Sequence, residues 1–149
     1  MNNEDSSKFL VVYDKPSSSD YCRGCLMESY SSDTGKQTFY NVSGVINFCV
    51  EKLSKPLGCG EDGYDITIYK DGCGFDDHIT FYSSGESGGV PYWDGDGEAD
   101  AIIQGVKVGL EVKKKEREEE KKKKENEEKR RERKEKEREF ARLKKELGK

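Results

Sequence analysis

The sequence predicts an α+β fold: a small antiparallel-rich sheet of about five strands with one short helix, followed by a long charged C-terminal helix. Short apolar or alternating runs typical of strands occur before residue 83, and two segments repeat apolar residues at helical spacing. The last quarter of the chain consists mainly of lysine, arginine and glutamate. The simplest architecture for these elements is a sheet with its helices on one face. Their order along the chain is strand, two strands, helix, two strands, helix.

Five segments are expected to be strands: Phe9–Tyr13, Cys22–Tyr30, Gln37–Val42, Tyr64–Tyr69 and His78–Tyr82. The first is apolar at every position, which is typical of a central strand. The second and third are joined through the turn-rich stretch Ser31–Gly35. The last two alternate apolar and polar residues around a glycine-containing turn, so they predict a hairpin.

Two helices are expected. Within Gly44–Leu53 the apolar residues form one stripe, and the helix should stop there because a proline follows at position 56. The second begins at Glu98 with Asp96 as its N-cap, and its apolar face consists of Ile102, Ile103, Val106 and Leu110. Lysine, arginine and glutamate are good helix formers, so this helix is expected to continue to about Leu147, roughly 75 Å at 1.5 Å per residue.

The charges divide the chain into two oppositely charged parts. Lys113–Lys149 contains 19 Lys+Arg and 12 Asp+Glu, a net charge of +7, which leaves 8 and 19, a net charge of −11, for the remainder. The expected organisation is a flexible lead over residues 1–7, an acidic α+β domain over residues 8–112, and a charged helical extension over residues 113–149. An acidic domain repels phosphates and anionic membranes. In the extension nearly every base has a glutamate close by, so the expected partner is a protein with a basic surface, with no nucleic acid and no membrane.

The extension is predicted to be a single monomeric helix. Glutamates precede bases by four residues at several positions, for example Glu120 and Lys124, an orientation that stabilises helices in water. A coiled coil is disfavoured, because it needs apolar residues every three or four positions and none occurs between Lys113 and Glu139. Phe140, Leu143 and Leu147 then form a short apolar stripe. Docking of this stripe on a partner and an incidental frayed end both remain open.

The cysteines allow three interpretations. Five cysteines without an export signal favour reduced thiols, and the polar first residues favour a cytoplasmic location. A cysteine-ligated zinc module is the alternative, with the candidate ligands Cys22, Cys25, Cys59 and Cys73. A thiol redox enzyme based on the first two is less favoured. The primary expectation is that the protein binds no metal and no cofactor.

The glycine-rich loop before the second helix contains the candidate binding residues Tyr92, Trp93, Asp94 and Asp96. Aromatic side chains often anchor protein interfaces, but the same rings could instead pack under the loop as a local lid. The carboxylates resemble a calcium loop only superficially, because Ala99 and Gly105 occupy positions where that loop needs glycine and glutamate. His78, the only histidine, is interpreted as structural.

The sequence therefore favours a non-catalytic protein–protein interaction module, in which an acidic domain is joined to a helical spacer or lever. Such a module could act as an adaptor, or as an inhibitor of a basic site on another protein. Motifs for phosphate binding, for a nucleophile elbow or for a histidine–glutamate zinc site do not occur.

Overall fold

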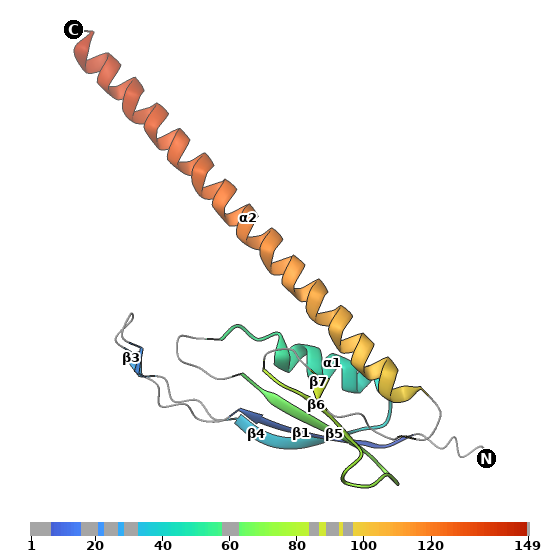
Figure 1. Cartoon of the computed structure of the whole chain (residues 1–149). Coiled ribbons are helices and arrows are strands. Elements are labelled where there is room, and N and C mark those ends of the chain that lie inside the picture. The colour runs from blue at the N-terminus through green and yellow to red at the C-terminus, as the bar shows by residue number, and fades with distance from the viewer. Residues whose placement is uncertain are drawn as a thin grey trace. The chain divides into compact units, whose positions relative to one another are not determined.

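The computed structural model describes residues 7–15, 21–22, 27–28, 33–57, 63–83, 87–88, 93 and 97–148. Figure 1 shows a sheet with helices and confirms the α+β class. The elements are, in chain order, β1 (Phe9–Lys15), β2 (Tyr21–Cys22), β3 (Met27–Glu28), β4 (Asp33–Phe39), α1 (Val42–Leu53), β5 (Asp65–Lys70), β6 (His78–Phe81), β7 (Ser87–Gly88) and α2 (Glu98–Leu147). By internal contacts the chain divides into Met1–Glu111 and Val112–Lys149.

The main sheet has the strand order β4-β1-β5-β6-β7, and all neighbouring strands are antiparallel. Strand β1 lies between β4 and β5, so the expected central position of Phe9–Tyr13 is confirmed. Because β4 and β5 both run antiparallel to β1, they are parallel to each other. Helix α1 therefore makes a crossover between two parallel strands that are separated by one strand.

Helix α1 begins two residues before the predicted start. Asn41 is its N-cap, with an extended backbone and a side chain that accepts a hydrogen bond from the Gly44 amide at 2.6 Å. The predicted strand Gln37–Val42 is therefore wrong at its end, because Val42 already belongs to the helix. The helix ends at Leu53, where the Ser54 amide donates to the Val50 carbonyl at 3.0 Å.

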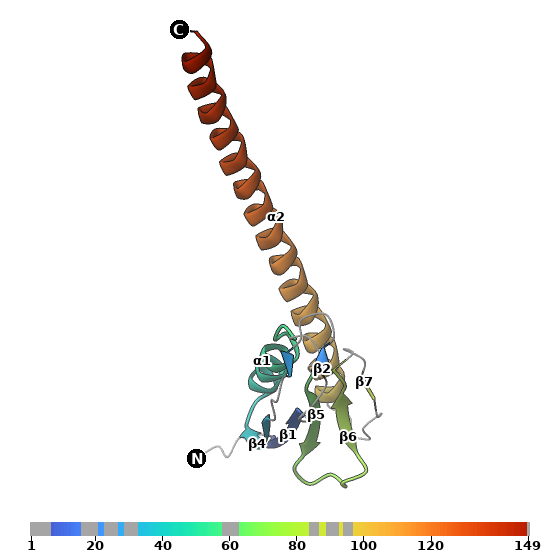
Figure 2. The ribbon, with the colours of Figure 1, turned by 90° about the vertical axis from the view of Figure 1, so that its left-hand side faces the viewer.

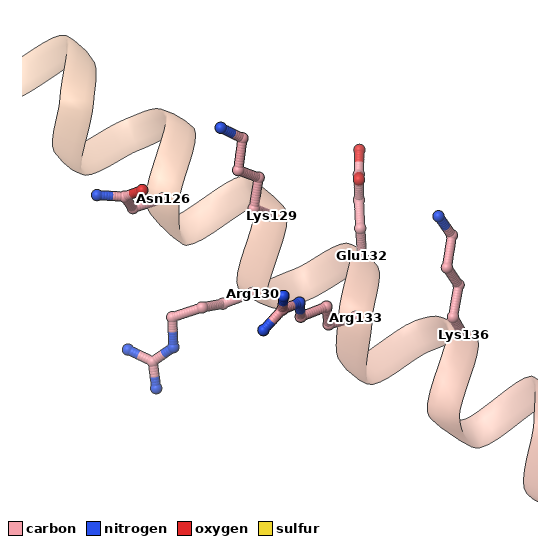
Figure 3. A pocket seen from close by; sticks show the side chains of 6 residues that line it. All are labelled: Asn126, Lys129, Arg130, Glu132, Arg133 and Lys136. Atoms are coloured by element: carbon pink, nitrogen blue, oxygen red, sulfur yellow. The ribbon is translucent and has the colours of Figure 1, made fainter.

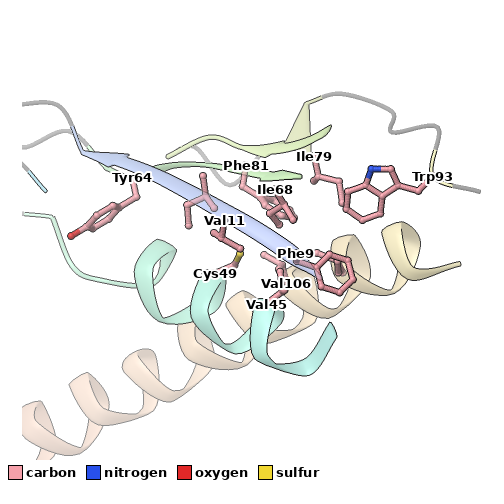
Figure 4. Packing of buried hydrophobic residues seen from close by; sticks show 12 residues of the cluster. Phe9, Val11, Val45, Cys49, Tyr64, Ile68, Ile79, Phe81, Trp93 and Val106 are labelled. Atoms are coloured by element: carbon pink, nitrogen blue, oxygen red, sulfur yellow. The ribbon is translucent and has the colours of Figure 1, made fainter. Parts of the chain in front are cut away.

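The core lies between one face of the sheet and the two helices (Figures 2 and 4). Alternate strand residues point into it: Phe9, Val11, Ile66, Ile68, Ile79 and Phe81. Val45 and Cys49 of α1 and Ile102 and Val106 of α2 cover them, and all four are fully buried. The alternation in β5 and β6 and the apolar faces predicted for both helices are thus confirmed.

Two glycines allow the helices to approach each other closely. A methyl group on Gly105 would overlap the Ile46 side chain, and one on Gly109 would lie 2.5 Å from a γ-methyl of Val50. Ile46 and Val50 belong to α1, so α2 packs on α1 through the faces of these two glycines. The i, i+4 spacing places both glycines on the same side of α2.

A charged cluster fixes the C-terminal end of α1 to the sheet. The Lys52 ammonium lies 3.0 Å from the Asp33 carboxylate and 4.5 Å from the centre of the Tyr13 ring. The Tyr64 hydroxyl donates to the same carboxylate at 2.5 Å. This hydrogen bond, together with Lys52, lowers the pKa of Asp33, whereas burial and the adjacent carboxylate raise the pKa of Tyr64 to about 12.

The segment between β1 and α1 differs most from expectation. The predicted strand Cys22–Tyr30 is wrong, because Cys22 and Met27 belong to different strands, β2 and β3, which pair antiparallel with each other. Asp33, Thr34 and Gly35 were expected in a turn but form the start of β4. Strand β4 pairs with β1 along the full length of both strands. Strand β7, predicted as loop, pairs with β6 through Thr80 and Gly88.

Candidate protein-interaction surface

The segment Val112–Lys149 makes a surface of exposed side chains. Every residue that the structure describes there is exposed and helical except Gly148, which forms the turn after the helix. Of the predicted glutamate-to-base pairs, the structure forms Glu120–Lys124 at 2.7 Å and Glu127–Arg131 at 3.0 Å. The first pair, through its hydrogen bond and its charge, lowers the pKa of Glu120. Helix propensity and such pairs support α2 here, in place of burial.

The apolar stripe Phe140, Leu143 and Leu147 lies in the last turns of α2. The exposed fractions of the three side chains are 70%, 44% and 87%. Positions i, i+3 and i+7 fall on one face of a helix, so the three side chains present a continuous strip. An ion pair joins Arg142 to Glu146 at 3.5 Å beside them and supports this last part of the helix.

A hollow of about 530 Å³ lies along α2 and is lined by Asn126, Lys129, Arg130, Glu132, Arg133 and Lys136. Figure 3 shows these side chains extending from one helix into solvent. A hollow lined by a single helix has no opposing wall, so this space does not enclose a small molecule. What it shows instead is a group of charged side chains available to a macromolecular partner.

Another hollow, of about 320 Å³, lies beside the turn that joins β5 and β6, where Tyr69 and Phe75 form part of its wall. Phe75 is 85% exposed and contacts the Tyr69 ring edge-on at 5.9 Å. His78 fixes this turn, since its Nδ1 lies 3.0 Å from the Phe75 carbonyl oxygen. The imidazole is half-buried, in agreement with the structural role expected for it.

Trp93 is part of the core. Its side chain is 8% exposed, its ring lies 5.9 Å from that of Phe9, and its indole N–H donates to the Asp77 carbonyl at 2.9 Å. This packing has the form of the local lid that was the alternative to a surface anchor. The other candidates of the same loop, Tyr92, Asp94 and Asp96, lie outside the described residues.

The structure describes few of the cysteine side chains. Cys49 is buried in the core, and burial raises the pKa of its thiol to about 12, which makes it a poor nucleophile. Cys73 is half-buried near the turn after β5. Of the other candidate ligands, Cys25 and Cys59 lie outside the described residues and Cys22 is described only as part of β2. Among the described residues, no three histidine, cysteine or acidic side chains gather as metal ligands.

The comparison with known families concerns the second half of the chain. The family described as "PRP1 splicing factor, N-terminal" matches residues 69–149, which is more than half of the sequence. The chain belongs to this family. The matched part begins at the end of β5 and includes β6, the turn carrying Phe75 and all of α2. No curated protein and no solved structure matches the chain.

Membership of the PRP1 splicing factor family contradicts the expected cytoplasmic location, because splicing takes place in the nucleus. The expectation failed for a physical reason. A signal peptide or a membrane span leaves an apolar segment in the sequence, whereas nuclear import is directed by basic clusters that resemble any charged helix. Neither α1 nor α2, the helices that the structure describes, combines the length and apolar character of a membrane span.

Phe75, Val108 and Val112 are among the further exposed apolar side chains that had not been singled out. Phe75 follows Gly72, Cys73 and Gly74 in a turn. Turns lie at the surface, so this position in the sequence was the signal that could have predicted the exposure of Phe75. Val108 and Val112 are spaced i, i+4 on α2, but they lie off the face that carries Ile102 and Val106. Only the helical phase distinguishes them from core residues.

Proposed function

We propose that this member of the PRP1 splicing factor family is a non-catalytic protein-interaction module, and that the stripe Phe140, Leu143 and Leu147 docks in an apolar groove of a protein partner in splicing. The observation that carries the proposal is the exposure of these three side chains on a helix whose other side chains from Lys113 onward are polar, except that of Ala141. Groove-binding helices present anchors at this spacing.

The size of the stripe limits the affinity it can supply. Full burial of one phenylalanine and two leucine side chains is worth about 1.5–3 kcal/mol each. Association itself costs roughly 4–15 kcal/mol in lost freedom, so the stripe alone gives at most weak binding. A second contact is therefore part of the proposal, and the net charge of −11 over residues 1–112 favours a basic protein surface for it.

Binding at one weak site raises the effective concentration at the other, so two such contacts in one chain can together give stable binding. A chain that holds two surfaces together in this way acts as an adaptor. The charged helix serves as the spacer between them. An inhibitor of a basic site would use the same acidic surface but would not need the stripe. Loss of the stripe therefore distinguishes the two roles.

The test compares the full chain with two triple variants in pull-downs from nuclear extract. The first changes Phe140, Leu143 and Leu147 to glutamine, which preserves helix propensity and removes the apolar surface. The matched control changes Phe75, Val108 and Val112 to glutamine, again one aromatic and two aliphatic residues, exposed by 85%, 59% and 48%. Circular dichroism checks that both variants keep the helix content of the wild type.

Proteins that the wild type and the control retain, and that the stripe variant loses, support the proposal. Equal recovery by all three forms would show that the stripe is an incidental apolar helix end. Sedimentation equilibrium of the isolated wild type tests the remaining case. A dimer that the stripe variant abolishes would show that a second copy of the chain covers the stripe, and would replace the proposal.

A further inference from the structure

The charges of α2 are distributed unequally around the helix, although they alternate along the sequence. At 3.6 residues per turn, one arc of about 160° between residues 121 and 138 carries seven bases and one acid, Glu137. The seven bases are Lys122, Lys123, Lys129, Arg130, Arg133, Lys134 and Lys136, and all are exposed. The opposite arc carries four bases and five acids. We refer to the first arc as the basic face.

Intrahelical pairing does not neutralise the basic face. The ion pairs beyond Val112 join Lys113 to Glu116, Glu120 to Lys124, Glu127 to Arg131 and Arg142 to Glu146. Among the residues that the structure describes, none of the seven bases takes part in an ion pair. Figure 3 shows four of them, Lys129, Arg130, Arg133 and Lys136, extending from consecutive turns, with Glu132 at the border of the face.

A glutamate four residues before a base stabilises a helix, and three of the seven bases have no glutamate at that position. The residues four positions before Arg130, Arg133 and Lys134 are Asn126, Lys129 and Arg130. Like charges at this spacing repel each other and destabilise a helix. The arrangement is therefore unfavourable in the free helix, and an anionic partner would relieve the repulsion.

We propose that the basic face binds the phosphates of a nucleic acid, RNA being the one on which splicing acts. The face extends over 14 residue steps from Lys122 to Lys136, roughly 21 Å, and a polyanion with regularly spaced charges can engage bases along this whole length. The guanidinium groups of Arg130 and Arg133 suit bidentate contacts to phosphate. This activity is separate from docking by the apolar stripe.

The acidic remainder of the chain does not exclude this binding. Exposed charges more than about 8 Å apart are largely screened at physiological ionic strength, so the neighbouring side chains of α2 dominate the field at the basic face. The closeness of glutamates to bases along the sequence of the extension, which favoured a protein partner, does not distinguish the two arcs. Phosphates approaching from the basic side meet an excess of six positive charges.

The test measures binding of the full chain to a fluorescein-labelled 20-nucleotide poly(U) RNA by fluorescence anisotropy between 50 and 200 mM salt. The first variant changes Lys129, Arg130, Arg133 and Lys136 to glutamine. The matched control changes Lys121, Lys124, Arg131 and Arg138 on the opposite arc to glutamine. Each variant removes two lysines and two arginines, so both have the same net charge, and circular dichroism checks their helicity.

If all seven bases contact phosphates, the slope of log K against log salt is roughly −5 for single-stranded RNA, a loss of roughly 900-fold in affinity between 50 and 200 mM. With three bases left, the slope falls to roughly −2 and the loss to roughly 20-fold. The control variant should keep the steeper slope. That pattern supports the proposal.

Three results would overturn it: an equal loss in both variants, which would mean that only the total charge matters; no binding of the wild type at 50 mM salt; or tighter binding to a 20-residue polyglutamate peptide than to the RNA. The last result would assign the face to an acidic protein.

Discussion

The contact between α1 and α2 decides whether replacing Gly109 by alanine raises or lowers the free energy of unfolding. In an exposed helix, replacing glycine by alanine stabilises by about 1 kcal/mol, because alanine has the higher helix propensity. At Gly109 the added methyl would lie 2.5 Å from one γ-methyl of Val50 and 3.3 Å from the other. Ordinary carbon–carbon contacts are about 3.5–4.0 Å, so the methyl group overlaps Val50 by about 1 Å.

Val50 cannot easily turn away, because a β-branched side chain within a helix has one strongly preferred χ1 rotamer. Overpacking of this kind costs about 1–3 kcal/mol. We therefore expect Gly109→Ala to reduce the free energy of unfolding by about 1 kcal/mol, the overpacking cost less the propensity gain. In a Val50→Ala background both γ-methyls are gone, so the same change should raise the free energy of unfolding by about 1 kcal/mol.

Urea denaturation followed by the fluorescence of Trp93 measures all four members of this double-mutant cycle. Trp93 is the only tryptophan and is buried beside Phe9, so it reports on the packed part of the chain, whereas circular dichroism is dominated by α2. The expected coupling energy between the two positions is about 2 kcal/mol. If Gly109→Ala stabilises the wild-type background, α1 does not pack on the Gly109 face and the reasoning is refuted.

Three further predictions follow from particular groups. The pKa of Tyr64 is raised to about 12, so its contribution to the free energy of unfolding is complete below pH 10 and is lost between pH 10 and 12. The pKa of Asp33 is lowered, so its contribution to the free energy of unfolding is lost as the pH falls below about 4. Urea titrations of Tyr64→Phe and Asp33→Asn should therefore depend less on pH than the wild type in those windows, and parallel curves would show that the hydrogen bond is not formed. Mass-mapped alkylation of the native protein at pH 8 should modify Cys73 well before Cys49, whose thiol is buried with a pKa of about 12; equal rates would contradict the burial. Deleting Lys113–Lys149 should change the urea midpoint reported by Trp93 little, because the extension contributes no buried residue among those described, whereas a large loss of stability would show that the extension is needed for folding.

Periodicity in the sequence was sufficient for the elements that face the core. The alternation around Ile66 and Ile68 predicted β5, and the stripe containing Val45 and Cys49 predicted α1. The long helix was predicted to run from Glu98 to about Leu147 because no residue after Val112 breaks a helix, and the structure confirms both ends. These features depend on local spacing, which a sequence displays directly.

Features that depend on partners distant in the sequence could not be predicted in this way. Gly35 belongs to β4 because it pairs with Tyr13, although its neighbours are typical of turns. Gly105 and Gly109 have no apolar side chain to appear in a periodic pattern, yet they set how closely α2 packs on α1. The candidate stripe Phe140, Leu143 and Leu147 was visible because it interrupts a long charged segment.

Two consecutive segments of α2 share one secondary structure but differ in what they bury. The first packs Ile102 and Val106 into the core, whereas beyond Val112 the described part of the helix is exposed throughout. Where nothing is buried, packing does not constrain which way a side chain faces. Pairs of glutamate and base at i, i+4 lie only about 40° apart around the helix, so pairing alone would mix acids and bases on every face. The excess of bases on one arc between residues 121 and 138 is therefore not a by-product of helix stabilisation, and it agrees with the proposed binding of phosphates.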